Sequence, residues 1–294
     1  MSNGTLVNLG DLSKPATVLI EKISDAVGAV FEPYQIKRLA RAEAEAEKIK
    51  AIAHIELTEI QQRAMIRMVQ EEGKKQENIE SISAKAIGDL QADAKPENVE
   101  NDWLATFFDK CKLVSDKEMQ GVWGRILAGE ANRPGTFSKR TIELISTLDK
   151  ADAHLFTALC GFGWMIGNIV PLIFDFEHDI YTKHGINFSA LTHLESLGLL
   201  RFEAQFGFIR KGLPKSFGVL YYGTPISLVF DKGTEKDNQL QTGKILLSQA
   251  GQELAPISGS RPVDGFIEYV SQQWAEQNVA TASSWPNMRF KPTA

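Results

Sequence analysis

The sequence predicts a mainly α-helical protein that ends in a small α+β domain. Up to about residue 166, apolar residues recur at the three- and four-residue spacing of helices. One stretch in this part is rich in Ala, Glu and Lys and contains neither Pro nor Gly. From residue 167 onward, short runs of aromatic and aliphatic residues are typical of β-strands. With 294 residues, 43% of them hydrophobic, the chain is large enough for more than one core.

Residues 1–33 are expected to hold one amphipathic helix, which begins after Ser13 and carries apolar residues along one side. A basic cluster follows it, formed by Lys37, Arg38 and Arg41. An apolar helix beside basic residues can lie on an anionic membrane, so residues 13–41 are a candidate for peripheral membrane contact. We favour packing of this helix on another helix, because its polar side is acidic as well as basic.

Residues 34–92 are predicted to be long, charged helices that assemble copies of the chain. No Pro or Gly interrupts residues 34–72, so one helix of about 58 Å is expected there, at 1.5 Å per residue. Gly73 is a candidate bend before a further helix over residues 77–90. A helix of this length cannot bury its apolar residues against a small domain. Residues 14–92 are therefore predicted to form a homo-oligomer, as a helical hairpin or a multi-helix coiled coil.

Residues 96–166 are predicted to form a core of four helices joined by short loops. The strongest helical pattern is the string DKEMQGVWGRILAGE, residues 116–130. Ser115 and Glu118 have the spacing of a capping box at its start, and Pro134-Gly135 ends it. Its apolar stripe consists of Met119, Val122, Trp123, Ile126 and Leu127.

An uncharged stretch over residues 155–174 approaches the length of a transmembrane helix. Three Gly residues and Pro171 interrupt it, and no cluster of Lys or Arg lies close to either end. We therefore predict a buried helix to about Ile166, a turn at Gly167-Asn168 and then a buried strand. Insertion of this stretch into a membrane is the alternative.

Residues 167–280 resemble a winged-helix domain, and residues 281–294 are expected to be a loose tail. A short helix over residues 187–198 precedes three β-like runs, and the string LLSQAGQEL then begins another short helix. In winged-helix domains the helix before the β-ribbon is the recognition helix. The resemblance thus implies a unit that contacts either nucleic acid or protein.

Nucleic-acid binding is the first alternative function, and the charges disfavour it. The chain has a net charge of −5, and residues 188–198 contain no Lys or Arg. A recognition helix needs such residues, or Asn and Gln, to reach bases and phosphates. One local basic group lies in this part of the chain and is expected on the ribbon: Arg201, Arg210, Lys211 and Lys215.

A metal-dependent hydrolase is the second alternative, with Asp175, His178 and His184 as candidate ligands. These residues lie in a strand-and-loop pattern, where alternate side chains point apart, and the chain has no HExxH string. It also lacks GxGxxG, GxxxxGK[ST] and GxSxG. The sequence therefore predicts no cofactor and favours a non-enzymatic function.

The two cysteines, Cys111 and Cys160, lie within apolar helical patterns, as expected for buried, reduced thiols. This use of cysteine is typical of a cytoplasmic protein. The first residues lack the basic and apolar regions of a secretory signal. We predict a cytoplasmic location, with membrane association through residues 13–41 as the alternative.

A polar cluster at the end of the strongest helix is the candidate binding site: Arg125, Glu130, Asn132 and Arg133. Polar residues held on a rigid scaffold beside a turn can form such a site. They can equally be helix caps and an ion pair, for example between Arg125 and Glu130. We favour this structural interpretation.

Four strings of the sequence are distinctive: DWLATFF, VSDKEMQGVWGRILAGE, RPGTFSKRTIELISTLDKADAHLF and LTHLESLGLL. They resemble the bacterial family known as domain of unknown function 2806, and the similarity extends from Lys14 to about Trp274. That family implies no catalytic residues. The helical core is also loosely similar to abortive-infection proteins that act against phage. Our leading hypothesis is a non-enzymatic, oligomerising scaffold, sensor or regulator with a role in phage defence or stress response.

Overall fold

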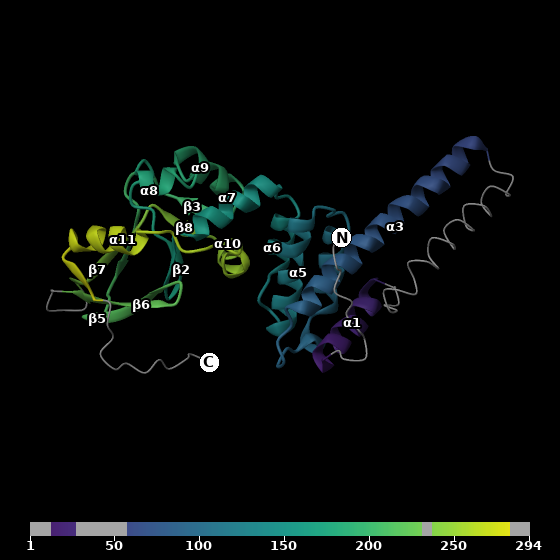
Figure 1. Cartoon of the computed structure of the whole chain (residues 1–294), viewed down its shortest axis with the longest axis horizontal. Coiled ribbons are helices and arrows are strands. Elements are labelled where there is room, and N and C mark those ends of the chain that lie inside the picture. Colours follow the sequence, from purple (N-terminus) through teal and green to yellow (C-terminus); the bar gives the residue numbers. More distant parts are fainter. Residues whose placement is uncertain (1–12, 28–57, 231–236, 283–294) are drawn as a thin grey trace, which may run out of the picture. The chain divides into compact units, whose positions relative to one another are not determined.

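The computed structural model describes residues 13–27, 58–230 and 237–282, and the chain divides into two compact units. Unit 1 is Met1–Ser146 and unit 2 is Thr147–Ala294 (Figure 1). Helices make up most of the described structure, and every described strand lies in unit 2. The prediction of a mainly helical chain with a β-containing C-terminal part is confirmed.

Unit 1 consists of helices packed around one apolar core. Its helices are α1 (Lys14–Val27), α3 (Glu59–Gly88), α4 (Asn101–Cys111), α5 (Lys117–Asn132) and α6 (Lys139–Ile145), with a short 3-10 helix, η2 (Pro96–Asn98). α5 packs extensively on α3, while α4 packs on α1 and α6. At the centre, Trp123 of α5 meets Phe107 of α4 edge-on, with ring centroids 5.2 Å apart.

The predicted stripe of α5 is confirmed, because its residues are buried or half-buried in unit 1: Met119, Val122, Trp123, Ile126 and Leu127. The N-cap of α5 is Asp116 and not Ser115. The Oδ1 atom of Asp116 accepts the N–H groups of Glu118 and Met119 at 2.9 and 3.0 Å. A carboxylate is favoured at this position because it faces the positive end of the helix dipole.

Residues 59–72 are helical as predicted, but the prediction of one uninterrupted helix over residues 34–72 is wrong at Thr58, because α3 begins at Glu59. Thr58 has an extended backbone and forms a capping box with Gln61. In this box the N–H of Thr58 donates to Gln61 Oε1 at 3.0 Å. A residue that caps a helix in this way cannot also continue a helix from upstream. The rest of that prediction, residues 34–57, lies outside the described residues.

The predicted bend at Gly73 is also wrong. α3 runs through this residue without a break, so the helix predicted over residues 77–90 is the C-terminal part of α3. A single Gly inside a helix costs only about 1 kcal/mol relative to Ala, and the packing of α3 on α5 outweighs that cost.

α1 is part of the core of unit 1. Its residues Ala16, Leu19 and Ile23 are buried, and the helix packs against α4 and η2. The Nζ atom of Lys22 also donates to the backbone oxygen of Val99. The apolar side of α1 is therefore used for packing on helices of its own unit. The predicted basic cluster beyond residue 27 lies outside the described residues.

The helix that was predicted to reach Ile166 ends at Cys160, and it belongs to unit 2. This helix, α7 (Lys150–Cys160), begins with a capping box between Asp149 and Asp152. The predicted core of four helices over residues 96–166 is thereby corrected. Unit 1 contains α4, α5 and α6 as expected, but α3 and α1 join them and α7 does not.

Strand β1 (Gly163–Ile166) follows α7, and its side chains alternate between buried and exposed. That alternation is the period of a strand, which explains why the helix does not continue. The turn predicted at Gly167 is confirmed, with a positive φ of 77°, and β2 (Asn168–Pro171) follows it. Helices long and apolar enough to cross a membrane are absent from the described part of the chain.

Unit 2 is built around an antiparallel sheet with the strand order β2-β1-β5-β6-β9. The added strands are β5 (Ser216–Tyr221), β6 (Thr224–Phe230) and β9 (Val279–Ala282). Two ribbons pair β3 (Leu200–Phe202) with β8 (Ile245–Leu247), and β4 (Phe208–Lys211) with β7 (Gln239–Gly243). The helices are α8 (Asp179–Thr182), α9 (Phe188–Ser196), α10 (Gln249–Leu254) and α11 (Phe266–Ala275), with the 3-10 helix η4 (Ala255–Ile257).

The core of unit 2 is aromatic. Trp164 of β1 stacks on Tyr221 of β5, with ring centroids 5.0 Å apart, and meets Trp274 of α11 edge-on at 5.1 Å. Phe266 of α11 contacts Phe162 at 5.0 Å. α11 therefore covers one face of the sheet. The predicted loose tail begins inside β9, and its remainder, residues 283–294, lies outside the described residues.

Candidate functional site

In the predicted site at the end of α5, Glu130 holds together two parts of unit 1. Glu130 lies in the last turn of α5 and is only 3% exposed. Its Oε1 atom accepts the N–H of Gly135 at 2.7 Å, and its Oε2 atom accepts the N–H of Phe137 at 2.9 Å. These two bonds hold the Pro-Gly loop against the helix. Both carboxylate oxygens are therefore engaged by the chain's own backbone.

The electrostatics of Glu130 agree with this structural role. Burial raises the pKa of its carboxyl, and hydrogen bonds from the backbone of Gly135, Phe137 and Thr136 oppose that shift. The charge of Glu100 raises the pKa further. Such a buried, hydrogen-bonded carboxyl is a satisfied polar group of the interior and not a group offered to a ligand.

Asn132 caps the end of α3. Its Oδ1 atom accepts the N–H of Gln91 at 2.9 Å, and its Nδ2 atom donates to the backbone oxygen of Asp89 at 3.2 Å. Arg133 is exposed and forms the C-cap of α5, while Arg125 is half-buried. Two of the four predicted site residues, Glu130 and Asn132, are therefore structural supports.

A second buried polar group, Gln120 of α5, joins α5 to α3. Its Nε2 atom donates to Asn78 Oδ1 at 3.0 Å and to the backbone oxygen of Val114 at 2.9 Å. Its Oε1 atom accepts the hydroxyl of Ser81 at 2.7 Å. Because a buried amide is costly when its partners are missing, this network fixes which face of α3 lies against α5.

The predicted basic group is not gathered on one ribbon. Arg201 lies on β3, in the ribbon of β3 and β8, whereas Arg210 and Lys211 lie on β4, in the ribbon of β4 and β7. Arg210 donates from Nη1 to the backbone oxygen of Ile166, so its guanidinium supports the turn after β1. Lys215 is exposed just before β5. The expectation of one basic ribbon is therefore corrected.

The predicted metal ligands have other partners. The Nδ1 atom of His178 accepts the N–H of Ile180 at 3.1 Å and caps α8. The ring of His184 meets Phe162 edge-on, with centroids 5.6 Å apart. Asp175 accepts the N–H of Glu177 at 3.0 Å. Within residues 13–27, 58–230 and 237–282, no three His, Cys, Asp or Glu side chains are arranged to hold a metal ion.

The N-terminal half of α3, residues 59–75, carries apolar side chains that face solvent. We call it the projecting half, because it extends away from α5 (Figure 1). Ile60 is 72% exposed, Met65 is 38% exposed and Met68 is 64% exposed. Large apolar side chains gathered on an exposed element mark interaction surfaces more often than scattered ones do.

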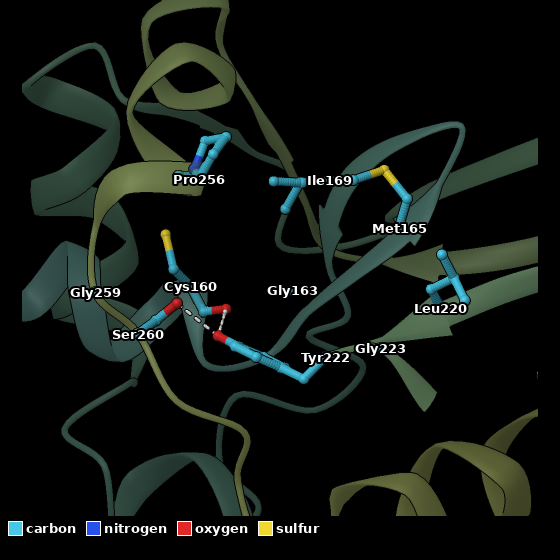
Figure 2. Close-up of a pocket in the computed structure, with 11 residues that line it drawn as sticks. Cys160, Gly163, Met165, Ile169, Leu220, Tyr222, Gly223, Pro256, Gly259 and Ser260 are labelled. Atoms are coloured by element: carbon cyan, nitrogen blue, oxygen red, sulfur yellow. Dashed lines mark hydrogen bonds between the residues drawn. The ribbon is translucent and has the colours of Figure 1, made fainter. Parts of the chain in front are cut away.

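Unit 2 holds a pocket of about 290 Å³ between β1, β5 and the segment around η4 (Figure 2). This volume lies just below the usual range of ligand pockets, about 300–1,000 Å³. Apolar side chains line most of it, among them Met165, Ile169 and Leu220. The hydroxyls of Tyr222 and Ser260 meet at one side of the pocket (Figure 2).

A comparison with protein families finds one match, described as "Protein of unknown function (DUF2806)", over residues 62–271. The match covers more than half of the chain and includes parts of both units. The chain belongs to the DUF2806 family. A search of curated proteins and a search of solved structures give no match.

Within the DUF2806 match, the string WGRILAGE of α5 is a packing motif. A Cβ atom on Gly124 would lie 2.8 Å from the Cβ of Lys85, so the backbones of α5 and α3 approach closely only with Gly there. A Cβ atom on Gly129 would lie 2.7 Å from the ring of Phe137. Trp123 and Glu130 of the same string are buried. The residue types of the string are therefore explained by packing within unit 1 and not by a chemical function.

The pocket of this DUF2806 member was not predicted from the sequence, because one of its three β-like runs, FGVLYYGTPISLVF over residues 217–230, was treated as a single run. The chain turns inside that run at Tyr222-Gly223, where both residues have positive φ, and β5 and β6 form a hairpin. Such two-residue turns usually carry Asn-Gly or Asp-Gly. Tyr at the first position hides the turn, and Gly223 was the only signal for it.

Proposed function

We propose that this protein is a self-associating, non-enzymatic scaffold or sensor, in which the projecting half of α3 joins two copies of the chain. One observation carries the proposal. The face of α3 that is buried in unit 1 continues into the projecting half, where it is exposed.

The geometry of the helix defines this face. Ile79, Ile82 and Ala86 of α3 are buried in unit 1. Met68 precedes Ala86 by five full turns at 3.6 residues per turn, so both side chains leave the helix in the same direction. Met65 lies at a neighbouring position on this face. The face that is covered in unit 1 is therefore open in the projecting half, and the ion pair of Lys75 with Glu72 lies between its two apolar parts.

The projecting half is built to persist as a helix. The capping box at Thr58 satisfies backbone N–H groups at its start. Ion pairs join Arg63 to Glu59 at 3.4 Å and Arg67 to Glu71 at 3.7 Å. Each exposed pair of this kind stabilises a helix by only about 0.3–0.5 kcal/mol. These local interactions keep the exposed face in one conformation, but they leave its apolar surface uncovered.

A second copy of the chain is the partner that this face fits. Two identical faces related by a two-fold axis are self-complementary, which is the commonest symmetry of soluble oligomers. Methionine side chains are flexible and polarisable, so Met65 and Met68 can pack against their own counterparts. A role in phage defence or stress response is the context we propose for this assembly, on the resemblance to abortive-infection proteins alone.

We also propose that unit 2 has a winged-helix-like arrangement, used for protein contact. The order of its elements supports this: α9 leads into β3, β3 pairs with β8, and β8 leads into α10. Strands β4, β5, β6 and β7 would then be an insertion within the ribbon. α9, which takes the place of a recognition helix, carries no Lys or Arg, so a contact with protein is favoured over nucleic acid.

The proposed contact can be measured with a spin label on residue 68 of the full-length protein. Cys111 and Cys160 are 0% and 3% exposed, and burial raises the pKa of each thiol. A maleimide nitroxide therefore labels Met68→Cys selectively. Pulsed electron paramagnetic resonance should give a short distance between labels on two copies.

The matched control is Gln70→Cys, because residue 70 is exposed and points to the opposite side of α3. Its labels should be clearly farther apart than those on residue 68. Equal distances at the two positions, or no intermolecular distance at residue 68, would overturn the proposal. A truncated protein that starts at Pro96 is unsuitable, since the truncation removes Ile79 and Ile82 from the core of unit 1.

A further inference from the structure

The pocket of unit 2 lies where two strands of the main sheet separate. β1 pairs with β2 over four residue pairs, but it pairs with β5 only at Met165 and Leu220. The opening beside this single pair is the pocket, and η4 with the loop that follows it forms the opposite wall. Met165 is 42% exposed at the mouth. The pocket is thus part of the sheet's architecture and not a gap between loose loops.

Tyr222 holds a strained backbone at the wall of this pocket. Its φ is 44°, in the left-handed region that side chains other than Gly, Asn and Asp rarely adopt. A conformation of this kind costs about 1–2 kcal/mol and persists only where the surroundings enforce it. Here the hydroxyl of Tyr222 is held by the backbone oxygen of Cys160 at 3.0 Å and by Ser260 Oγ at 2.5 Å (Figure 2). The strain therefore positions an aromatic ring and a hydroxyl at the pocket.

The polar atoms of the pocket form one small cluster. The one hydroxyl proton of Tyr222 has two acceptors, the backbone oxygen of Cys160 and Ser260 Oγ. The hydroxyl of Ser258 likewise contacts the backbone oxygen of Ala255 at 2.8 Å and Ser260 Oγ at 3.2 Å. Because a hydroxyl can both donate and accept, this cluster can form a hydrogen bond with a hydroxyl group of a ligand. Among the residues that the structure describes, none that lines the pocket is Asp, Glu, Lys, Arg or His. The remaining walls are apolar, formed by Ile169, Leu220 and Pro256 among others.

We propose that this pocket binds a small, uncharged ring compound that carries one hydroxyl group. The ring would lie among the apolar walls, against Leu220 and Ile169, and its hydroxyl group would face Ser260. A charged ligand is excluded by chemistry, because burying an unpaired charge among uncharged groups is costly. The volume of 290 Å³ corresponds to about ten water molecules at about 30 Å³ each, which limits the ligand to one or two fused rings.

The probe for this proposal is 2-naphthol, which is uncharged at neutral pH and has one hydroxyl on two fused rings. Its binding to the full-length protein should be measurable by fluorescence titration, with a dissociation constant at or below about 1 mM for a ligand of this size. The anion 2-naphthalenesulfonate has the same rings and should bind at least about tenfold more weakly.

Three variants locate the binding. Met165→Glu places a charge at the mouth and should weaken 2-naphthol at least about tenfold. Ser260→Ala removes the hydroxyl that faces the ligand and should weaken 2-naphthol binding about two- to tenfold. Leu246→Glu is the matched control, because Leu246 is a strand residue that is 36% exposed and does not line the pocket. It should bind 2-naphthol as the wild type does.

Three results would overturn the proposal. One is that 2-naphthol shows no saturable binding even at concentrations several times higher than about 1 mM. Another is an equal loss of affinity in Met165→Glu and Leu246→Glu, which would place the binding elsewhere. The third is equal affinities for 2-naphthol and 2-naphthalenesulfonate, which would reject the uncharged ligand class. Because the pocket lies in unit 2, none of these outcomes depends on self-association through α3.

Discussion

The end of α5 and the projecting half of α3 reverse the usual distribution of polar and apolar side chains. Glu130 of α5 is charged in sequence yet only 3% exposed, and both of its oxygens accept backbone N–H groups. Met68 of α3 is apolar yet 64% exposed. A buried polar group that has its partners stabilises the fold, whereas this apolar face is exposed among the described residues of unit 1. We therefore assign a structural role to the end of α5 and an interaction role to the projecting half of α3.

The largest loss of stability is expected for a substitution in the part of α3 that packs on α5. Ile82→Ala should lower the free energy of unfolding by about 2–5 kcal/mol, because Ile82 is fully buried and its removal leaves a cavity. Urea denaturation followed by circular dichroism measures this loss. A change below about 0.5 kcal/mol, the range of surface substitutions, would mean that this face of α3 is not part of the core.

Glu130→Ala should cost nearly as much, about 2–4 kcal/mol, since it leaves the N–H groups of Gly135 and Phe137 without their acceptor. The same denaturation experiment measures it, and hydrogen exchange of these two amides should become faster. The exposed residue Arg133 provides the control, because Arg133→Ala should change stability by less than about 0.5 kcal/mol. If both variants were equally stable, Glu130 would not support the loop.

The pH dependence tests what sets the ionisation of Glu130. Burial raises its pKa above the ordinary value of 4.5. A pKa that is raised in the folded state means that the stabilising contribution of this group is complete below pH 4.5 and is lost as the pH rises through the raised pKa. The free energy of unfolding of the wild type, minus that of Glu130→Gln, should therefore fall over this window. A difference that increases with pH would show that the backbone N–H donors lower the pKa of Glu130 by more than burial raises it.

The smallest effect on stability is expected in the projecting half. Met68→Ala should change the free energy of unfolding by less than about 0.5 kcal/mol in dilute protein, although Met68 lies on the same face as Ile82. The measurement should be made at the lowest usable concentration, where association contributes least. A loss as large as that of Ile82→Ala would place Met68 inside a core and remove the contrast between the two regions.

Local sequence patterns explain how much of the fold could be predicted. The stripe of α5 has one period over its whole length, so its buried residues followed from spacing alone. The end of α7 did not follow, because the residues around Gly163 are apolar in every direction and fit a buried helix as well as a strand. The partner of α5 was also missed. α3 has a charged surface and a weak apolar stripe, and only tertiary contact selects its C-terminal half for the core.

The candidate sites show the same limit. Clusters in sequence suggested a metal site at His178 and a basic ribbon at Arg210, but His178 caps α8 by accepting the N–H of Ile180, and Arg210 donates to the backbone oxygen of Ile166. The bond of Arg210 joins residues that are far apart in the chain, and spacing in sequence does not encode such a contact. The pocket beside Tyr222 depends on one turn with positive φ and on the separation of two strands. Neither feature leaves a residue pattern that is specific enough to recognise.

Sedimentation velocity of the full-length protein tests the proposed self-association most directly. The wild type at micromolar concentration should sediment as an oligomer. Met65→Lys/Met68→Lys should sediment as a monomer, because lysines on the exposed face of α3 would be buried without partners in the contact. Gln70→Lys, on the opposite side of the helix, should behave as the wild type. A monomeric wild type, or one mass for all three proteins, would contradict the account.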